Sequence, residues 1–176
     1  SVFERNAQKG LNPHQGIVTL LDCDTGIPKA LLNGCELTAV RTAAVSAIAT
    51  MVLARPEANT MAIIGAGVQA TEHVLAINEI RDIQRVHVCC RSQQSFKRFQ
   101  DSLKSLSVDV CHFKEAKDAI QNVDIIVTCT PGHEVLFSIE DISPGCHINA
   151  IGACRPNEQE IHLADRDDFS LYVDSM

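Results

Sequence analysis

The sequence lacks the features that mark several special classes of protein. It has only 15 Lys and Arg residues against 22 Asp and Glu residues, which gives a formal net charge of -7. Because no basic stripe appears either, we expect no nucleic-acid partner. No apolar run approaches the roughly 18 residues of a membrane span, and the first residues do not resemble a signal peptide. The sequence therefore predicts a protein without membrane contact.

The eight cysteines lack the paired C-x-x-C spacing of a zinc site, so no metal centre is expected. A disulfide framework is typical of small secreted chains, which this 176-residue sequence does not resemble. Most of the cysteines fall in apolar, strand-like runs, as small core residues do. This use of cysteine predicts reduced thiols and a cytoplasmic location.

The strongest positive signal is a short apolar run, MAII at residues 61–64, followed at once by a glycine turn and an amphipathic stretch. Strand, turn and helix together match the dinucleotide fingerprint G-x-G-x-x-A. Such a turn brings the backbone and the positive end of a helix close to a pyrophosphate, whereas a tight turn without a ligand needs no second glycine. The expected cofactor-binding residues here are Gly65, Ala66, Gly67, Val68, Gln69 and Ala70.

From residue 60 onward, strand-like and helix-like patterns alternate. This alternation predicts an α/β fold, a Rossmann-like doubly wound parallel sheet. Strands are expected at 60–64, 85–90, 108–112, 124–128, 146–151 and 169–173, and helices at 67–81, 93–106, 115–121 and 158–164.

The residues before the fingerprint have a different character. Residues 1–34 have the pattern of strands and turns, with a hairpin at 15–21 and 27–32, and a long helix rich in small residues is expected at 36–54. We predict a partial β-rich substrate or dimerisation domain at 1–35 and an NAD(P)-binding Rossmann domain at 36–176. The chain starts in the middle of a strand-like pattern without Met, which indicates a piece of a longer protein.

The end of the second strand in a dinucleotide fold sets the preference between NAD and NADP. This chain has Arg91 there, with Ser92 and Ser95 close behind, and no carboxylate to hold the ribose hydroxyls of NAD. These three residues could bind the NADP phosphate, so NADP is favoured. A solvated arginine at a strand end, with NAD as the cofactor, is the alternative.

Ligands of doubly wound sheets bind beyond the carboxyl ends of the strands. Thr130 follows the fourth strand and is expected near the nicotinamide ribose. Cys154 is expected near the nicotinamide face, but without an identifiable base it is not expected to act as a nucleophile. The corresponding residues at the end of the fifth strand are Asn149, Ala150 and Ile151.

Arg41 is unusual because it lies among small and apolar residues in the first turns of the predicted helix. Its guanidinium could bind a substrate carboxylate in a bidentate manner, or its side chain could extend to solvent at the surface. The residues alone do not separate these alternatives.

Several segments together resemble the ornithine cyclodeaminase/mu-crystallin family. They are LTAVRTAAVSAIAT (37–50), IGAGVQA (64–70), HINAIGACRP (147–156) and LYVDS (171–175), with shorter matches at 13–16 and 24–26. The resemblance covers essentially the whole chain, and the first segment is most similar to the mu-crystallin/ketimine reductase branch.

The resemblance implies a homodimeric two-domain enzyme that uses a nicotinamide cofactor on a small imine or amino-acid substrate. Arg41 would bind the substrate carboxylate. His14 would lie near the pocket between the domains, unless it is a structural turn histidine. Family members carry a catalytic Lys shortly before the Phe that matches Phe3, which would fall upstream of Ser1. The isolated chain is therefore expected to bind cofactor but to turn over little substrate.

Position 154 separates the activities within the family. Cyclodeaminases carry an acid/base Asp where this chain has Cys154, and a thiol cannot replace a carboxylate in proton transfer at the same pKa. We therefore expect an NAD(P)H-dependent reductase of a small cyclic imine (ketimine) carboxylate. Three alternatives stay open: ornithine cyclodeamination, alanine dehydrogenation, and a mu-crystallin-like protein that binds NADPH and a small ligand.

Overall fold

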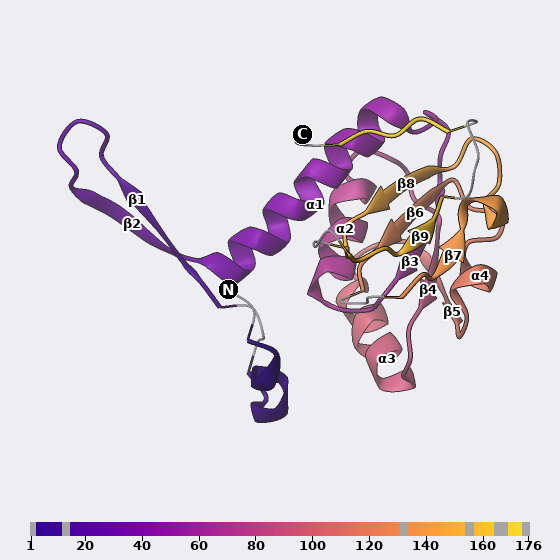
Figure 1. Ribbon diagram of the computed structural model, residues 1–176, viewed down its shortest axis with the longest axis horizontal. Coiled ribbons are helices and arrows are strands. Elements are labelled where there is room, and N and C mark those ends of the chain that lie inside the picture. The colour runs from indigo at the N-terminus through magenta and orange to yellow at the C-terminus, as the bar shows by residue number, and fades with distance from the viewer. Residues whose placement is uncertain (1–2, 12–14, 131–133, 154–156, 164–168, 174–176) are drawn as a thin grey trace.

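A five-stranded parallel sheet forms the centre of the molecule, with the strand order β5-β4-β3-β6-β8 (Figure 1). The computed structural model describes residues 3–11, 15–130, 134–153, 157–163 and 169–173. In chain order the sheet reads 3-2-1-4-5, the arrangement of a dinucleotide fold, with its switch point between β3 and β6. The strands are β3 (Thr60–Ile64), β4 (Arg85–Cys89), β5 (Asp109–Phe113), β6 (Ile125–Thr128) and β8 (His147–Ala150).

Helices cover both faces of the sheet, which confirms the doubly wound fold predicted from the alternating pattern. Helices α1 (Gly34–Leu53), α2 (Val68–Asn78) and α3 (Gln93–Ser102) pack on one face, around a core that includes Ile63 and Val127. The short helix α4 (Ala116–Ala119) and the strands β7 (Phe137–Ser138) and β9 (Ile161–His162) pack on the other. Successive strand residues point to opposite faces, so β3, β4, β5 and β6 each contribute to both cores.

Helix α1 starts at Gly34, two residues earlier than expected, because Asn33 acts as its N-cap. The Asn33 side chain accepts a hydrogen bond from the Cys35 N–H at 3.0 Å. Gly34 also lies against Gly16, where a Cβ would stand 2.8 Å from the Gly16 carbonyl group. The sequence pattern at Asn33 and Gly34 therefore marks a helix start packed on the base of the hairpin.

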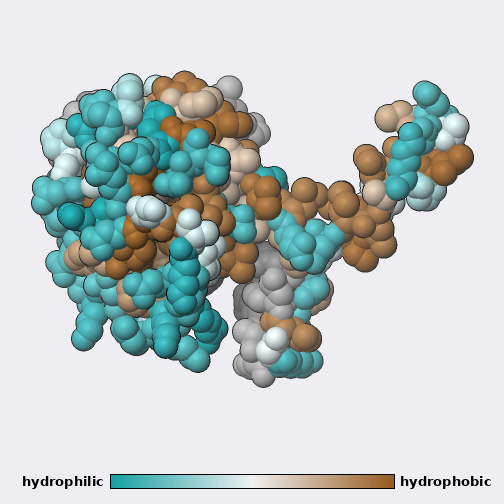
Figure 2. All heavy atoms as spheres, turned by 180° about the vertical axis from the view of Figure 1, so that it is seen from behind, coloured by the Kyte–Doolittle hydropathy of each residue, from teal (hydrophilic) through white to brown (hydrophobic). Residues whose placement is uncertain are grey.

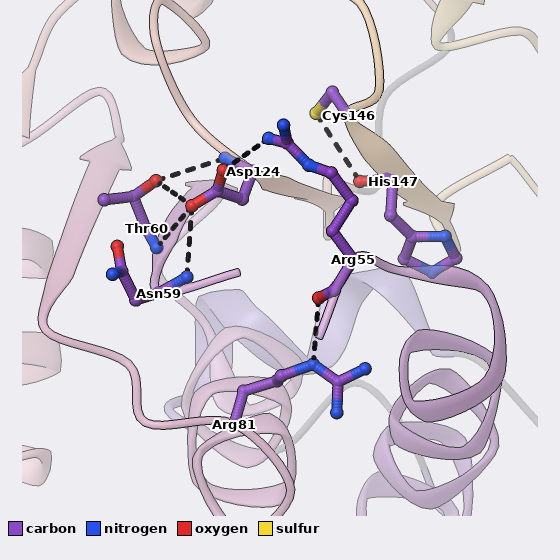
Figure 3. Close-up of polar contacts among 7 residues, drawn as sticks. All are labelled: Arg55, Asn59, Thr60, Arg81, Asp124, Cys146 and His147. Carbon is purple, nitrogen blue, oxygen red and sulfur yellow. Dashed lines mark hydrogen bonds and ion pairs between the residues drawn. The ribbon is translucent and has the colours of Figure 1, made fainter. Parts of the chain in front are cut away.

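A partly buried network around Asp124 fixes the amino edge of the sheet (Figure 3). The Asp124 carboxylate accepts hydrogen bonds from the N–H groups of Asn59 and Thr60 and from the Thr60 hydroxyl, the last at 2.6 Å. Its other oxygen pairs with Arg55 at 2.6 Å. Burial alone would raise the pKa of Asp124, but these hydrogen bonds and the Arg55 charge hold it below its usual value. Arg81 then binds three carbonyls at the end of α1, which anchors that end at the same edge.

The structure corrects the sequence expectations in three segments. Residues 4–9 form the 3₁₀ helix η1 (Glu4–Lys9), where strands and turns were expected. In the segment expected to be helical at 158–164, the described residues 158–163 are not helical, because the Glu160 carbonyl accepts from the Leu136 N–H and β9 pairs with β7. The described residues 169–173 form no strand, and the apolar side chains at 171–173 are exposed.

The N-terminal hairpin is confirmed, with β1 (Ile17–Leu21) antiparallel to β2 (Pro28–Asn33). It projects from the start of α1, away from the sheet (Figure 1). Its apolar side chains are exposed on both faces, Ile17 by 71% on one and Leu20 by 55% on the other, and Figure 2 shows this apolar surface continuing toward the body. A boundary between domains at residue 35 stays a prediction.

Helix α1 corrects the expectation that nothing in the chain is long and apolar enough to cross a membrane. Its 20 residues meet that criterion by length and composition. The core helices of soluble proteins meet the same criterion, so this is weak evidence for a membrane. The buried side of α1, which includes Ala43 and Ala47, packs on α2 and β8.

Candidate functional site

The candidate site lies at the carboxyl edge of the sheet, where four strands end side by side. In the strand register, the last residues of the four strands are neighbours: Cys89 of β4, Ile64 of β3, Thr128 of β6 and Ala150 of β8. Backbone hydrogen bonds then continue the pairing into the loops, from Gly65 to Cys89, from Cys129 to Ile64 and from Ile151 to Thr128. The edge is therefore a continuous platform rather than a set of separate loops.

The two glycines of the fingerprint meet different requirements. Gly65 has a φ of +118°, and a Cβ there would lie 2.8 Å from the Cys129 carbonyl oxygen, so the protein itself demands glycine. Gly67 has an ordinary φ of -94°, and no atom lies within 4 Å of where its Cβ would stand. Nothing in the described structure requires glycine at 67. Its absent side chain leaves open space, as close approach of a ligand would need.

The head of α2 has unused hydrogen-bonding capacity. Its N-cap is Gly67, which supplies no side-chain bond to the first-turn N–H groups. The Oε1 of Gln69, in that first turn, is buried and has no hydrogen-bond partner among the described residues. Ala70 is fully buried and allows α2 to pack close to the sheet. The first-turn N–H groups suit a pyrophosphate held at the helix N-terminus, whereas the Gln69 Oε1 can only accept a hydrogen bond from a donor group.

A buried glutamate that the sequence did not reveal joins two of the strand ends. Glu160 is only 2% exposed. Its carboxylate accepts hydrogen bonds from the hydroxyls of Thr128 at 2.7 Å and Thr130 at 2.6 Å, and from the Gly152 N–H at 2.9 Å. A Cβ at Gly152 would overlap both Glu160 and the Thr130 carbonyl. Glycine at 152 thus leaves the room that the Glu160 carboxylate occupies.

Asn149 uses its side chain inside the protein. It is buried, its Nδ2 donates to the Thr50 hydroxyl at 2.9 Å, and its Oδ1 lies 3.3 Å from the His147 ring. The Asn149 amide therefore faces α1 and ties β8 to it. At the end of β8, Ala150 is exposed and Ile151 is half-buried, so these two residues lie nearer to the space beyond the edge.

At the tip of β4, Arg91 is exposed, and the two serines behind it are bonded to each other. Ser92 is the N-cap of α3: its hydroxyl oxygen accepts from the Ser95 N–H at 3.1 Å and its proton goes to the Ser95 hydroxyl at 2.9 Å. Ser92 therefore has a capping role that the sequence analysis did not include. A phosphate-binding role for these residues stays a prediction.

Arg41 is exposed on α1. The end of α1 is fixed at the amino edge, and Ser46 contacts His73 of α2. Arg41 lies five residues before Ser46, about 7.5 Å further toward the carboxyl edge at the rise of an α-helix. His14 and Cys154, the other two expected site residues, lie outside the described residues.

The cysteines and the acidic residues form no metal centre among the described residues. All seven described cysteines are free. Burial, more than any neighbouring charge, raises the pKa of Cys89 to about 11 and that of Cys146 to about 12. Burial and then the Glu160 charge also raise the pKa of Cys129, beside the site. These thiols stay protonated near neutral pH.

The strand order, the open turn at Gly67 and the uncapped head of α2 define a nucleotide-binding domain of the Rossmann class. The particular family follows from comparison with known proteins. The sequence profile of the ornithine cyclodeaminase/mu-crystallin family matches residues 1–176. The chain belongs to this family.

Individual relatives are similar along nearly the whole chain. The ketimine reductase mu-crystallin of Rattus norvegicus is 36% identical over 98% of this chain and 54% of its own length. The Delta(1)-pyrroline-2-carboxylate reductase of Bacillus cereus is 40% identical over 92% of this chain and 50% of its own. The structure of the Thermococcus litoralis enzyme of that name, in complex with NADH and L-proline, aligns with a TM-score of 0.86 at 33% identity, covering 91% of this chain and 50% of that one. The chain thus spans about half the length of these relatives.

Proposed function

We propose that this chain is the cofactor-binding part of an NAD(P)H-dependent reductase of small cyclic imine carboxylates. The observation that carries the proposal is the open turn at Gly67, at the switch point of the sheet and at the head of α2. The names of the rat and Bacillus relatives, both imine reductases, support the reaction class. The NADH in the Thermococcus structure supports a nicotinamide cofactor.

The residues at the carboxyl edge fit such a cofactor. The pyrophosphate would lie over Gly67 and the first-turn N–H groups of α2, and the nicotinamide end near Thr130 and Ile151. Arg91, exposed at the tip of β4, would take the 2′-phosphate of NADP, which is the cofactor we favour over NAD. A bound NAD(P)H supplies a hydride from C4 of its nicotinamide ring.

Arg41 would bind the substrate carboxylate through two parallel hydrogen bonds and so orient the imine carbon toward the cofactor. Its positive charge offsets that of the carboxylate, and it need not transfer a proton. His14 and Cys154 are proposed to lie near the substrate. A homodimer and a cytoplasmic location also remain proposals for the whole protein.

The test is the rate of NADPH and NADH oxidation by the full-length protein, with five- and six-membered cyclic imine carboxylates as substrates. Wild type should reduce an imine, with NADPH preferred. Arg41→Ala should lower kcat/KM about 100-fold, the value of a lost bidentate ion pair, and Arg41→Lys should recover little. Arg98→Ala, which removes an exposed arginine from α3, is the matched control and should change nothing.

Other outcomes distinguish the alternatives. Tight NADPH binding without turnover would favour the ligand-binding protein. NADH oxidation with pyruvate and ammonia, but not with imines, would favour an amino-acid dehydrogenase. Full activity of Arg41→Ala would contradict the role of Arg41 whichever reaction is found.

A further inference from the structure

The three bonds to Glu160 connect parts of the chain that end separate strands. Thr128 is the last residue of β6, Thr130 lies two residues beyond it, and Gly152 follows β8. All three donors are neutral, and all three bonds are 2.9 Å or shorter. Hydrogen bonds to a buried carboxylate are stronger than those between neutral groups. Glu160 thus holds the loops after β6 and β8 in one arrangement.

We propose that Glu160 is a positioning residue for the nicotinamide end of the cofactor and that it acts through Thr130. This inference rests on the proposed function. A hydroxyl has one proton to donate, and Thr130 gives its proton to Glu160 Oε1. Toward a ligand, the Thr130 oxygen can therefore only accept a hydrogen bond, from a ribose hydroxyl or from the carboxamide of the nicotinamide. Glu160 itself does not contact the cofactor.

Glu160→Gln tests this inference because it should change a hydrogen-bond direction while keeping the fold. The amide oxygen of Gln can still accept from Thr128 and Gly152, which share Oε2. The amide nitrogen then replaces Oε1, and Thr130 must accept from it and turn its own proton toward the ligand. The variant thus presents a donor where the wild type presents an acceptor.

The experiment measures binding to the full-length protein by calorimetry. The ligands are the dinucleotide that wild type prefers and, for the adenosine half alone, ADP and adenosine 2′,5′-bisphosphate. Glu160→Gln should lower the affinity for the dinucleotide about tenfold, the cost of one mismatched buried hydrogen bond. Its affinity for the two adenosine nucleotides should stay within about twofold of wild type. Glu134→Gln makes the same chemical change at an exposed carboxylate and should leave both unchanged.

Two further variants separate positioning from general damage. Thr130→Val should weaken the dinucleotide to a similar extent, and the double variant with Glu160→Gln should be no worse than Thr130→Val alone, because both act on one contact. Thr128→Val alters a fully buried residue that cannot reach the ligand. Thr128→Val should lower the affinity for the dinucleotide but not for the adenosine nucleotides, and Thr128→Ser should restore it. This pair of variants keeps the inference testable if Glu160→Gln fails to fold.

Four results would overturn the inference. The inference would lose its basis if Glu160→Gln bound the dinucleotide as tightly as wild type does. Equal weakening of both cofactor halves would show a general structural role, and losses that multiply in the double variant would show that Glu160 does not act through Thr130. A wild type that binds neither dinucleotide nor adenosine nucleotide would contradict the proposed function, and this inference with it.

Discussion

Gly65 and Gly67 are two residues apart in one motif, yet they are constrained by different things. Gly65 is fixed by its positive φ and by the Cys129 carbonyl, so the fold alone explains it. Gly67 has neither constraint among the described residues, and close approach of a ligand would account for its missing side chain. The sequence motif predicted that both glycines bind the cofactor. Only the structure distinguishes Gly65, which the fold requires, from Gly67, which leaves room for a ligand.

His73 is the most deeply enclosed titratable side chain between α1 and α2, with an exposed fraction of 0%. Its Nδ1 donates to the Gln69 carbonyl at 2.7 Å, and its Nε2 accepts from the Ser46 hydroxyl at 3.0 Å. Burial lowers the pKa of His73 and outweighs the opposite effect of the Gln69 bond. Burial also lowers the pKa of His147, across the Asn149 contact. Both rings are therefore neutral in the folded protein.

This predicts that stability falls as the pH falls below about 6.5. Below about pH 6.5, His73 and His147 bind protons in the unfolded chain but remain neutral in the folded protein until the pH reaches their lower folded pKa values. The free energy of unfolding therefore rises with pH between those folded pKa values and about 6.5. From pH 7.5 to 5.5, each histidine should cost up to about 1 kcal/mol. Urea unfolding at the two pH values should show this slope, and His73→Gln should reduce it. An unchanged slope in the His73→Gln/His147→Gln double variant would contradict this account.

At the scale of elements, the sequence correctly predicted the strands and helices whose buried residues recur with the regular spacing of a strand or a helix. The five strands of the sheet and helices α2 and α3 are present, because apolar residues recur there as a two-sided strand or a one-sided helix requires. The helix expected at 158–164 was wrong because the structure of this segment depends on the contacts of Glu160 and on pairing with β7, which no local pattern reveals. Nothing in the local sequence distinguishes Glu160, and only its tertiary contacts identify it as part of the site.

The hairpin of β1 and β2 has apolar side chains that the described residues leave exposed. Apolar residues such as Leu20 and Leu31 are exposed along it, and a two-stranded ribbon is marginal in water by itself. We expect it to join a larger sheet in the full-length protein, which we propose to be a homodimer. Hydrogen exchange of that protein should then show slow amides at 17–21 and 28–33, and sedimentation should show a dimer. Rapid exchange there, or a monomer, would contradict this expectation.

At the scale of the whole molecule, helix α1 connects the hairpin to the candidate site. Its end is anchored at the amino edge by Arg81, near the Asp124 network (Figure 3). Its first half extends toward the hairpin (Figure 1) and carries Arg41, which is exposed. The glycine turn and the Glu160 clamp come from separate parts of the sequence and meet at the carboxyl edge of the sheet.

The central claim is that the carboxyl edge at Gly67 binds a dinucleotide, and Gly67→Asp tests it most directly. The structure has room for the side chain, and Asp is a favourable N-cap residue, so thermal stability should be unchanged or slightly higher. The same carboxylate would occupy the pyrophosphate position and repel it.

The measurement is the Kd for NADPH and NADH of full-length wild type and Gly67→Asp, beside their melting temperatures. The account predicts that wild type binds and that Gly67→Asp loses at least about 100-fold in affinity, since steric exclusion and charge repulsion add, while its melting temperature does not fall. Equal binding by the two proteins would contradict the claim that this edge is the cofactor site.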